Sequence, residues 1–426
     1  GSDLGRTLTC IANGQQVLDG QADPSELGVT ALDSKTLKID LAYSYEDFPK
    51  LMASSAAMPC NEKFFTESQG QYGLEAGTTL GNGPYTFSTS YSWTHRDDPK
   101  RFVDHLCKMG LDQPLGLQIA GEQKPVPAGI SFTIGAEIMN SANAIANGTV
   151  DAAPITGEQL EAAHAADMNL TSFEDTALGV CFNMQDSVFQ NANIRSAFLK
   201  TLNREQVLSS LPENYSQAQS VIPPQTTLSG ENYRTLAGEC SLPAYEQGQG
   251  KAYLEAGLNE LQLDSLPKVT ILCLDSPGAK AIVNNLLENW NSALGYYLNL
   301  NAVSENELQS ALRNGNYQLA LCPLRADNDG PWELLNLFSS ENPYNPAGYQ
   351  NQDYNNLLSQ IKASPGEDGA ALCLQAENHL IQNLVFYPLV YEKRYFASAQ
   401  NVTGIIFHPY NGGIDFIGAE KTEAEA

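Results

Sequence analysis

The stretch Thr176–Pro224 constrains the fold more than any other part of this chain. It begins with an apolar run over Leu178–Phe182, which predicts a strand, followed by a short loop rich in Asn, Asp and Ser. Apolar residues then recur at helical spacing and predict an amphipathic helix with one buried face, formed by Ile194, Ala197, Phe198 and Leu202. The stretch is therefore a strand–loop–helix unit that needs a sheet and further helices to cover it.

Capping residues mark where the helices of this stretch should begin and end. Asn193 is the expected N-cap of the first helix. Asn203, with Gln206 three residues later, predicts a capping box that starts a second helix over Arg204–Leu211. Two consecutive prolines, at 223 and 224, then favour extended chain.

The most regular part of the chain follows at residues 269–322. Apolar runs and helical spacing alternate there, and they predict strand 269–274, helix 279–294, strand 296–303, helix 308–313 and strand 317–322. Ser304 and Glu307 form a capping box before the second helix, and Asn314-Gly315 ends it. Such a β-α-β-α-β order predicts an α/β fold with a parallel sheet, right-handed crossovers and helices on both faces.

A similar helix–Asn-Gly–strand pattern occurs earlier, where a helix over 142–147 is stopped by Gly148 and followed by a strand over 149–153. The repeat predicts two α/β lobes: residues 1–178 with 392–426, and an inserted lobe over 179–391. Later helices over 354–361 and 370–384, and a strand over 386–390, lead back to the first lobe. Two strands crossing between lobes would form a hinge, with ligand expected in the cleft.

Length and charge narrow the possible functions. The 426 residues are too many for one core and suit two lobes. The formal net charge of −26 argues against nucleic acid or an anionic membrane as partner, because both require basic patches. It is consistent with simple solubility or with cationic ligands. The sequence has no apolar run near the roughly 20 residues that span a bilayer, and it shows no export signal.

No pattern in the sequence points to catalysis, a cofactor or a metal. The eight cysteines are scattered, no CxxC occurs, and no Cys/His spacing suits zinc. Cys181, Cys273 and Cys322 lie inside apolar runs and are expected to be buried free thiols, although pairing of the others stays open. The common hydrolase and nucleotide-binding motifs are missing. We therefore expect a non-catalytic protein.

Three segments resemble one family of proteins. Asn191–Val207 with Val221–Pro224 is similar to a motif of the peptide-binding extracellular solute-binding proteins that feed ABC importers, with Asn203 where the family usually has Asp. Gly28–Leu41 and Gly81–Phe87 resemble its "GV-A-D-TL" strand pair and "GPY" turn. The family's N-terminal segment before that strand pair is not recognisable. The resemblance implies a two-lobed (class II) periplasmic-binding-protein fold.

A fourth segment bears on the ligand. Leu324–Phe338 is similar to the family's "aromatic-x-A-D-Y-x-x-P" stretch, in which the Asp pairs with the α-ammonium of a peptide. Asp327 matches that Asp, and a carboxylate in a closing cleft would bind an ammonium through charge-assisted hydrogen bonds. Leu324 replaces the family's aromatic residue, and Arg325 and Asn328 complete the predicted ligand-binding set. The alternative is a solvated loop ahead of Pro331.

The resemblance implies a monomer that binds short peptides and delivers them to a membrane ABC permease. It would act outside the cytoplasm, either in the periplasm or anchored at the cell surface. Two alternatives stay open. The ligand could be a sugar or a metal chelate, or the chain could be a degenerate relative that serves as a surface sensor or adhesion module.

Overall fold

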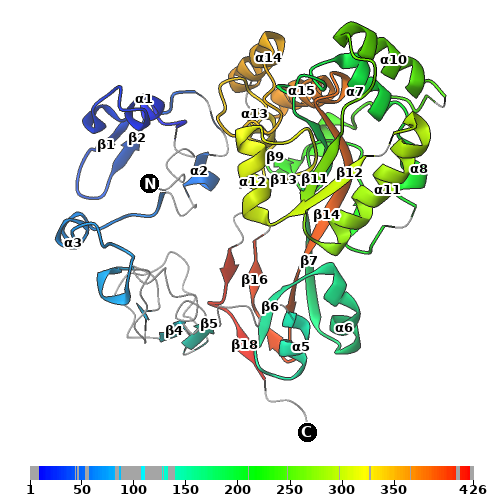
Figure 1. Cartoon of the computed structure of the whole chain (residues 1–426). Coiled ribbons are helices and arrows are strands. Elements are labelled where there is room, and N and C mark those ends of the chain that lie inside the picture. The colour runs from blue at the N-terminus through cyan, green and yellow to red at the C-terminus, as the bar shows by residue number, and fades with distance from the viewer. Residues whose placement is uncertain are drawn as a thin grey trace. The chain divides into compact units, whose positions relative to one another are not determined.

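The computed structural model describes residues 9–43, 45, 48–52, 57–81, 86–87, 107–110, 127, 129–132, 140–209, 211–246, 248–296, 298–325, 328–364, 366–408 and 413–422. The chain forms two compact units: unit 1 is Gly1–Ala56 with Glu174–Lys393, and unit 2 is Ala57–Phe173 with Arg394–Ala426 (Figure 1). The first 56 residues thus group with the middle of the chain, whereas the predicted lobes placed them with residues up to 178. The lobe boundaries themselves stay a prediction.

The main sheet of unit 1 has the strand order β12-β11-β13-β7-β14, and β8 pairs with β14. Its strands are β7 (Asn169–Phe182), β8 (Tyr215–Gln217), β11 (Thr270–Leu274), β12 (Asn299–Val303), β13 (Leu319–Arg325) and β14 (Phe386–Ser398). β11 is parallel to both β12 and β13, which confirms the predicted parallel core. β13 is antiparallel to β7, so the complete sheet is mixed. The chain changes unit within β7 and again within β14.

Helix α11 (Pro277–Leu294) shows how the sequence builds this core. Ser276 caps its first turn, and Gly295 ends it in the left-handed region at φ 76°. Trp290 is fully buried and donates a hydrogen bond from Nε1 to the Phe198 carbonyl at 2.7 Å. The two rings meet edge to face, with centroids 5.2 Å apart. This contact joins α11 to α7 (Ala192–Leu199), the helix of the family-like motif.

The start of α7 corrects one prediction. The N-cap is Asn191, not Asn193, because the Asn191 Oδ1 accepts from the backbone N–H groups of both Asn193 and Ile194. Asn203 is the N-cap of the next helix, since its side chain accepts from the Gln206 N–H at 3.2 Å, which is one of the two hydrogen bonds of the predicted capping box. The helix that follows, α8 (Arg204–Val207), ends earlier than the predicted Leu211.

Further helices of unit 1 lie between residues 233 and 382. They are α9 (Tyr233–Ala237), α10 (Gly250–Leu261), α12 (Glu305–Asn314), α13 (Trp332–Asn336), α14 (Gln352–Ala363) and α15 (Ala370–Gln382). The capping box of Ser304 and Glu307 before α12 and the left-handed Gly315 after it are confirmed. Figure 1 shows α13, α14 and α15 grouped together. A short hairpin of β9 (Thr227–Leu228) and β10 (Glu231–Asn232) precedes α9.

The N-terminal part of unit 1 has its own small cluster of buried side chains around Cys10, Ile11 and Leu51. It contains α1 (Gly14–Leu18), β1 (Val29–Ala31), β2 (Leu37–Ile39) and α2 (Phe48–Leu51). β1 and β2 form the antiparallel pair expected from Gly28–Leu41. Ile11 forms an isolated antiparallel bridge to Leu41, and the Ala12 N–H donates to the Asp40 carbonyl at 2.8 Å.

Unit 2 is built from short elements. They are α3 (Glu62–Glu67), β3 (Thr86–Phe87), β4 (Cys107–Gly110), β5 (Gly129–Phe132), α5 (Ser141–Ala146), β6 (Ala152–Ile155), α6 (Leu160–Ala165), β15 (Val402–Thr403), β16 (Ile406–Phe407), β17 (Ile414–Asp415) and β18 (Glu420–Lys421). β6 pairs with the last residues of β14, Tyr395–Ser398. Gly148, at φ 74°, is the predicted stop after α5. The centre of the predicted "GPY" turn, residues 82–85, lies outside the described residues.

Candidate ligand-binding site

The predicted ligand-binding residues lie at the end of β13 and in the loop that leads to α13. Leu324 is buried, at 2% exposure, and pairs with Ala177 of β7 in the sheet register. Arg325 is exposed and is the last residue of the strand. Asp327 lies outside the described residues. Leu324 therefore lies in the core in this state, and Arg325 and Asn328 are the predicted polar residues that the structure describes.

Asn328 is the most informative of these residues. It is 8% exposed, and its Oδ1 accepts from the Gly330 N–H at 2.9 Å. That hydrogen bond fixes the orientation of the amide, because a backbone N–H can only donate. The Nδ2 is buried and has no partner in the part of the chain that the structure describes. A buried donor without a partner costs about 1–3 kcal/mol, so this amide favours any change that supplies an acceptor.

The β9–β10 hairpin holds this loop in place. The Thr227 N–H donates to the Asp329 carbonyl at 2.6 Å, and the Thr227 hydroxyl donates to the Asp329 carboxylate. The hairpin follows the Val221–Pro224 segment of the motif, so it links the end of the motif to the predicted ligand loop.

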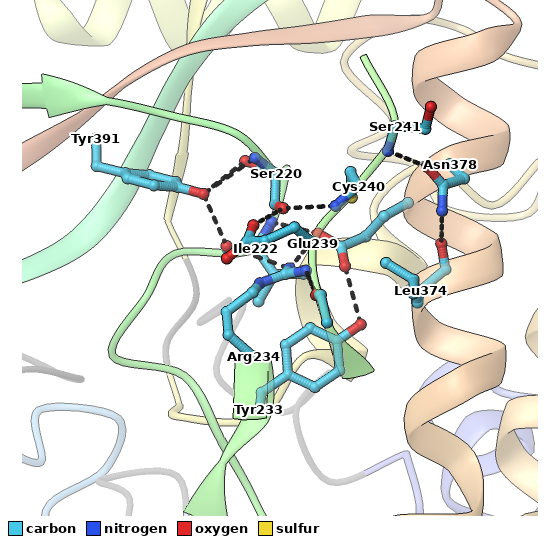
Figure 2. Close-up of polar contacts among 12 residues, drawn as sticks. Ser220, Ile222, Tyr233, Arg234, Glu239, Cys240, Ser241, Leu374, Asn378 and Tyr391 are labelled. Carbon is cyan, nitrogen blue, oxygen red and sulfur yellow. Dashed lines mark hydrogen bonds and ion pairs between the residues drawn. The ribbon is translucent and has the colours of Figure 1, made fainter. Parts of the chain in front are cut away.

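Beneath the hairpin lies a buried polar network that the sequence analysis missed (Figure 2). Its centre is Glu377 on α15, which is fully buried. The Glu377 carboxylate pairs with the Arg234 guanidinium, and it accepts from the Ile222 N–H at 2.8 Å and from the Tyr233 hydroxyl at 2.9 Å. The network therefore ties α9 and the chain after β8 to α15.

Further hydrogen bonds extend this network on both sides (Figure 2). The Tyr391 hydroxyl accepts from the Ser220 N–H and lies 3.1 Å from the Ser220 carbonyl. The Ser220 hydroxyl donates to Glu239 at 2.9 Å, and the Ser241 N–H donates to Asn378 on α15 at 2.8 Å. Because Tyr391 is on β14, the network fixes the 220–241 segment to both β14 and α15.

The electrostatics of the network suit a structural role. Burial raises the pKa of Glu377, although the Arg234 charge and the hydrogen bonds oppose that change. Burial also raises the pKa of the thiols of Cys240 and Cys373 to about 12 in each case. Such thiols are protonated at neutral pH and are poor nucleophiles.

The two arginines of the motif likewise act on the backbone. Arg195 is buried and donates from Nη1 to the carbonyls of Phe189 and Gln190, at 2.7 and 2.8 Å, and from Nη2 to that of Asn383. Arg204 donates to three more carbonyls, those of Pro388, Ala218 and Leu389. Both side chains thus join the motif to the segment that opens β14.

Neither a metal centre nor a spanning helix is found among the described residues. No three His, Cys, Asp or Glu residues there are grouped as a metal ion would require. No helix described is both long and apolar enough to cross a bilayer. Cys181, Cys273 and Cys322 are buried free cysteines, as predicted.

Two long strands, β7 and β14, pass from one compact unit of this mixed α/β architecture to the other. Residues 8–346 match the family described as bacterial extracellular solute-binding proteins, family 5, middle region. The chain belongs to this family, and the resemblance noted from the motifs is confirmed.

Individual relatives agree with this assignment. The chain is 25% identical over 420 residues to the dipeptide-binding protein DppE of Bacillus subtilis, a match that covers 96% of this chain and 73% of DppE. It is 23% identical over 428 residues to the oligopeptide-binding protein OppA of the same organism, with the same two coverages. The structure of Listeria monocytogenes OppA bound to peptide superposes with a TM-score of 0.76 at 19% identity, covering 99% of this chain and 80% of that one. These matches confirm the predicted two-lobed fold class.

Proposed function

We propose that this chain binds short peptides outside the cytoplasm and delivers them to the permease of an ABC importer. The observation that supports this function is the match of 96% of the chain to dipeptide- and oligopeptide-binding proteins within its family. The relatives named above are binding proteins, and they favour peptide over a sugar or metal chelate, and transport over a sensor or adhesion role.

The ligand-binding loop follows β13. In the proposal, the Asp327 carboxylate pairs with the α-ammonium of the peptide, and the unpaired Nδ2 of Asn328 supplies a donor for a ligand carbonyl after a small movement of the loop. Arg325 is exposed beside them, and the buried Leu324 supports the loop from the sheet. A peptide acceptor would recover part of the cost of the unpaired Asn328 amide.

The finer features of the function are proposals as well. The protein is a monomer without enzymatic activity, cofactor, metal or nucleic-acid partner, and it is either periplasmic or anchored at the cell surface. Its family is extracellular, and its net charge of −26 disfavours binding to polyanions.

Two measurements test the proposal. Mass spectrometry of small molecules released by denaturing gently purified protein should detect peptides of a few residues. Titration calorimetry should then show that Asp327→Asn weakens peptide binding at least about tenfold, or roughly 1.4 kcal/mol. N-acetylation of the peptide should weaken wild-type binding by a similar factor and leave the variant nearly unchanged. A variant that binds peptide as tightly as wild type would rule out Asp327 as the ammonium partner.

A further inference from the structure

The segment Gln225–Thr227 contacts two places that are far apart in the sequence. At one end, the Gln225 Oε1 accepts from the Glu174 N–H at 2.6 Å. Glu174 is the first residue of unit 1 on β7, where the chain arrives from unit 2. At the other end, Thr227 makes its two hydrogen bonds to Asp329 in the predicted ligand loop. We call Gln225–Thr227 the strap.

The base of the strap is held firmly. The Thr226 N–H donates to the Pro223 carbonyl at 3.2 Å, and the Thr226 carbonyl accepts from the Tyr233 N–H at 3.0 Å. Asn232 Nδ2 donates to the Pro224 carbonyl at 2.8 Å. Below it, the Ile222 N–H bonds to the buried Glu377. The strap is therefore a short segment whose backbone is held by hydrogen bonds between its two ends.

Glu174 is also connected to the second place where the chain changes unit. Its carboxylate accepts from the Ser216 hydroxyl at 2.6 Å and lies 4.0 Å from the Lys393 Nζ. Lys393 is the last residue of unit 1 on β14. The Lys393 N–H in turn donates to the Asn214 carbonyl at 2.7 Å. Glu174 therefore contacts residues near both crossings, and its N–H is hydrogen-bonded to Gln225 at the start of the strap.

We propose that the strap couples the strand crossing at Glu174 to the loop at Asn328–Gly330, so that bending at the crossing and ligand binding at the loop influence each other. This rests on the proposed function, because it takes that loop as the place where peptide binds. The coupling free energy is the same in both directions, so if ordering the loop stabilises the crossing, ordering the crossing stabilises the loop by the same amount. Gln225 and Thr227 are positioning residues, since they act through Glu174 and Asp329.

Hydrogen exchange of the ligand-free protein tests the coupling directly. Thr227→Val removes the hydroxyl but keeps the side-chain shape, and it should speed exchange at the Gly330 amide by about three- to tenfold, the factor expected from losing one hydrogen bond. The decisive result is at the far end, where the Glu174 amide should also exchange about two- to threefold faster. Gln225 is exposed, so its bond to Glu174 is at the weak end of that range.

Matched variants distinguish coupling through the strap from a general loss of local stability. Thr227→Ser restores the hydroxyl and should return both amides to wild-type exchange. Thr235→Val makes the same substitution at an exposed position on the neighbouring α9 and should change neither. Gln225→Met removes the other bond and should speed exchange at Gly330 as well as at Glu174. Unchanged exchange at Glu174 in Thr227→Val, or at Gly330 in Gln225→Met, would overturn the coupling.

A binding measurement keeps the two proposals distinct. If wild type binds tri-alanine, Thr227→Val should weaken binding about two- to tenfold and Thr227→Ser should restore it. If wild type binds no peptide while the exchange results are as expected, the coupling stands and the peptide-binding function fails. If peptide binds normally in all variants and Glu174 exchange does not respond, the function stands and the coupling fails.

Discussion

Replacement of Glu377 by Gln should test the buried network beneath the hairpin most sharply. The carboxylate is fully buried, and the Arg234 side chain that pairs with it is only 10% exposed. Because burial opposes ionisation of Glu377, the intact pair adds little net stability. Removing one partner is different, because the guanidinium is then left buried without an anion, which typically costs about 3–5 kcal/mol.

The contacts place Glu377→Gln near the lower end of this range. The Gln oxygen can still accept from the Ile222 N–H or the Tyr233 hydroxyl, and Arg234 keeps its bond to the Gly238 carbonyl at 2.9 Å. With the Gln oxygen facing Ile222 and Arg234, the new NH₂ group meets the Tyr233 hydroxyl, which can accept a hydrogen bond, but the guanidinium has lost its anion. We therefore expect a loss of about 3 kcal/mol in the free energy of unfolding.

Urea unfolding followed by circular dichroism measures this loss as a lower midpoint at an unchanged slope. Glu255→Gln, at an exposed position on α10, is the matched control and should stay within about 0.5 kcal/mol of wild type. Combining Glu377→Gln with Arg234→Met should cost less than the sum of the two single variants, because the unpaired cation is gone. A loss below about 1 kcal/mol in Glu377→Gln, or simple additivity in the double variant, would refute the idea that the pair is mutually dependent.

Three further predictions concern the core. Gly179→Ala would place its Cβ 2.4 Å from the Phe386 ring, so thermal melting should show that the free energy of unfolding falls by about 1–3 kcal/mol. The control Gly77→Ala, whose Cβ meets nothing within 4 Å, should leave the free energy of unfolding unchanged. Burial lowers the pKa of His379, so unfolding free energy should fall as pH drops below about 6.5, and His379→Gln should reduce that slope in urea titrations at several pH values. Arg195→Lys cannot reach the same three carbonyls, and urea titrations should show that it lowers the free energy of unfolding by about 1–3 kcal/mol.

Local patterns predicted the elements whose determinants lie close together in sequence. The capping box of Ser304 and Glu307 and the left-handed Gly315 were predicted correctly, because each needs only residues within one helix. The parallel β11–β12 and β11–β13 pairs follow from helices that alternate with apolar strands. The cap of α7 was placed two residues late, since Asn191 and Asn193 are both good caps by residue type.

Contacts between segments that are distant in the sequence cannot be predicted from local patterns. Glu377 and Arg234 are far apart in the sequence, and neither stands out on its own helix by spacing or composition. The grouping of the first 56 residues with the middle of the chain also depends on tertiary packing. For the candidate site, resemblance predicts the loop, but the buried, unpaired amide of Asn328 is visible only in the three-dimensional structure.

The roles of the residues in the family motif explain why the resemblance predicts the fold better than it predicts the ligand. Three of its polar residues act on the protein's own backbone: Asn203 caps α8, while Arg195 and Arg204 bond to carbonyls in the segment that opens β14. These contacts stabilise the packing of α7 against β14, and that packing does not depend on which ligand the protein binds. We therefore expect specificity to come from loops outside the motif. Thr227, which follows the motif by three residues, contacts one such loop at Asp329. Ligand preference should therefore respond to substitutions at 325–329, whereas substitutions at Arg195 or Arg204 should change stability.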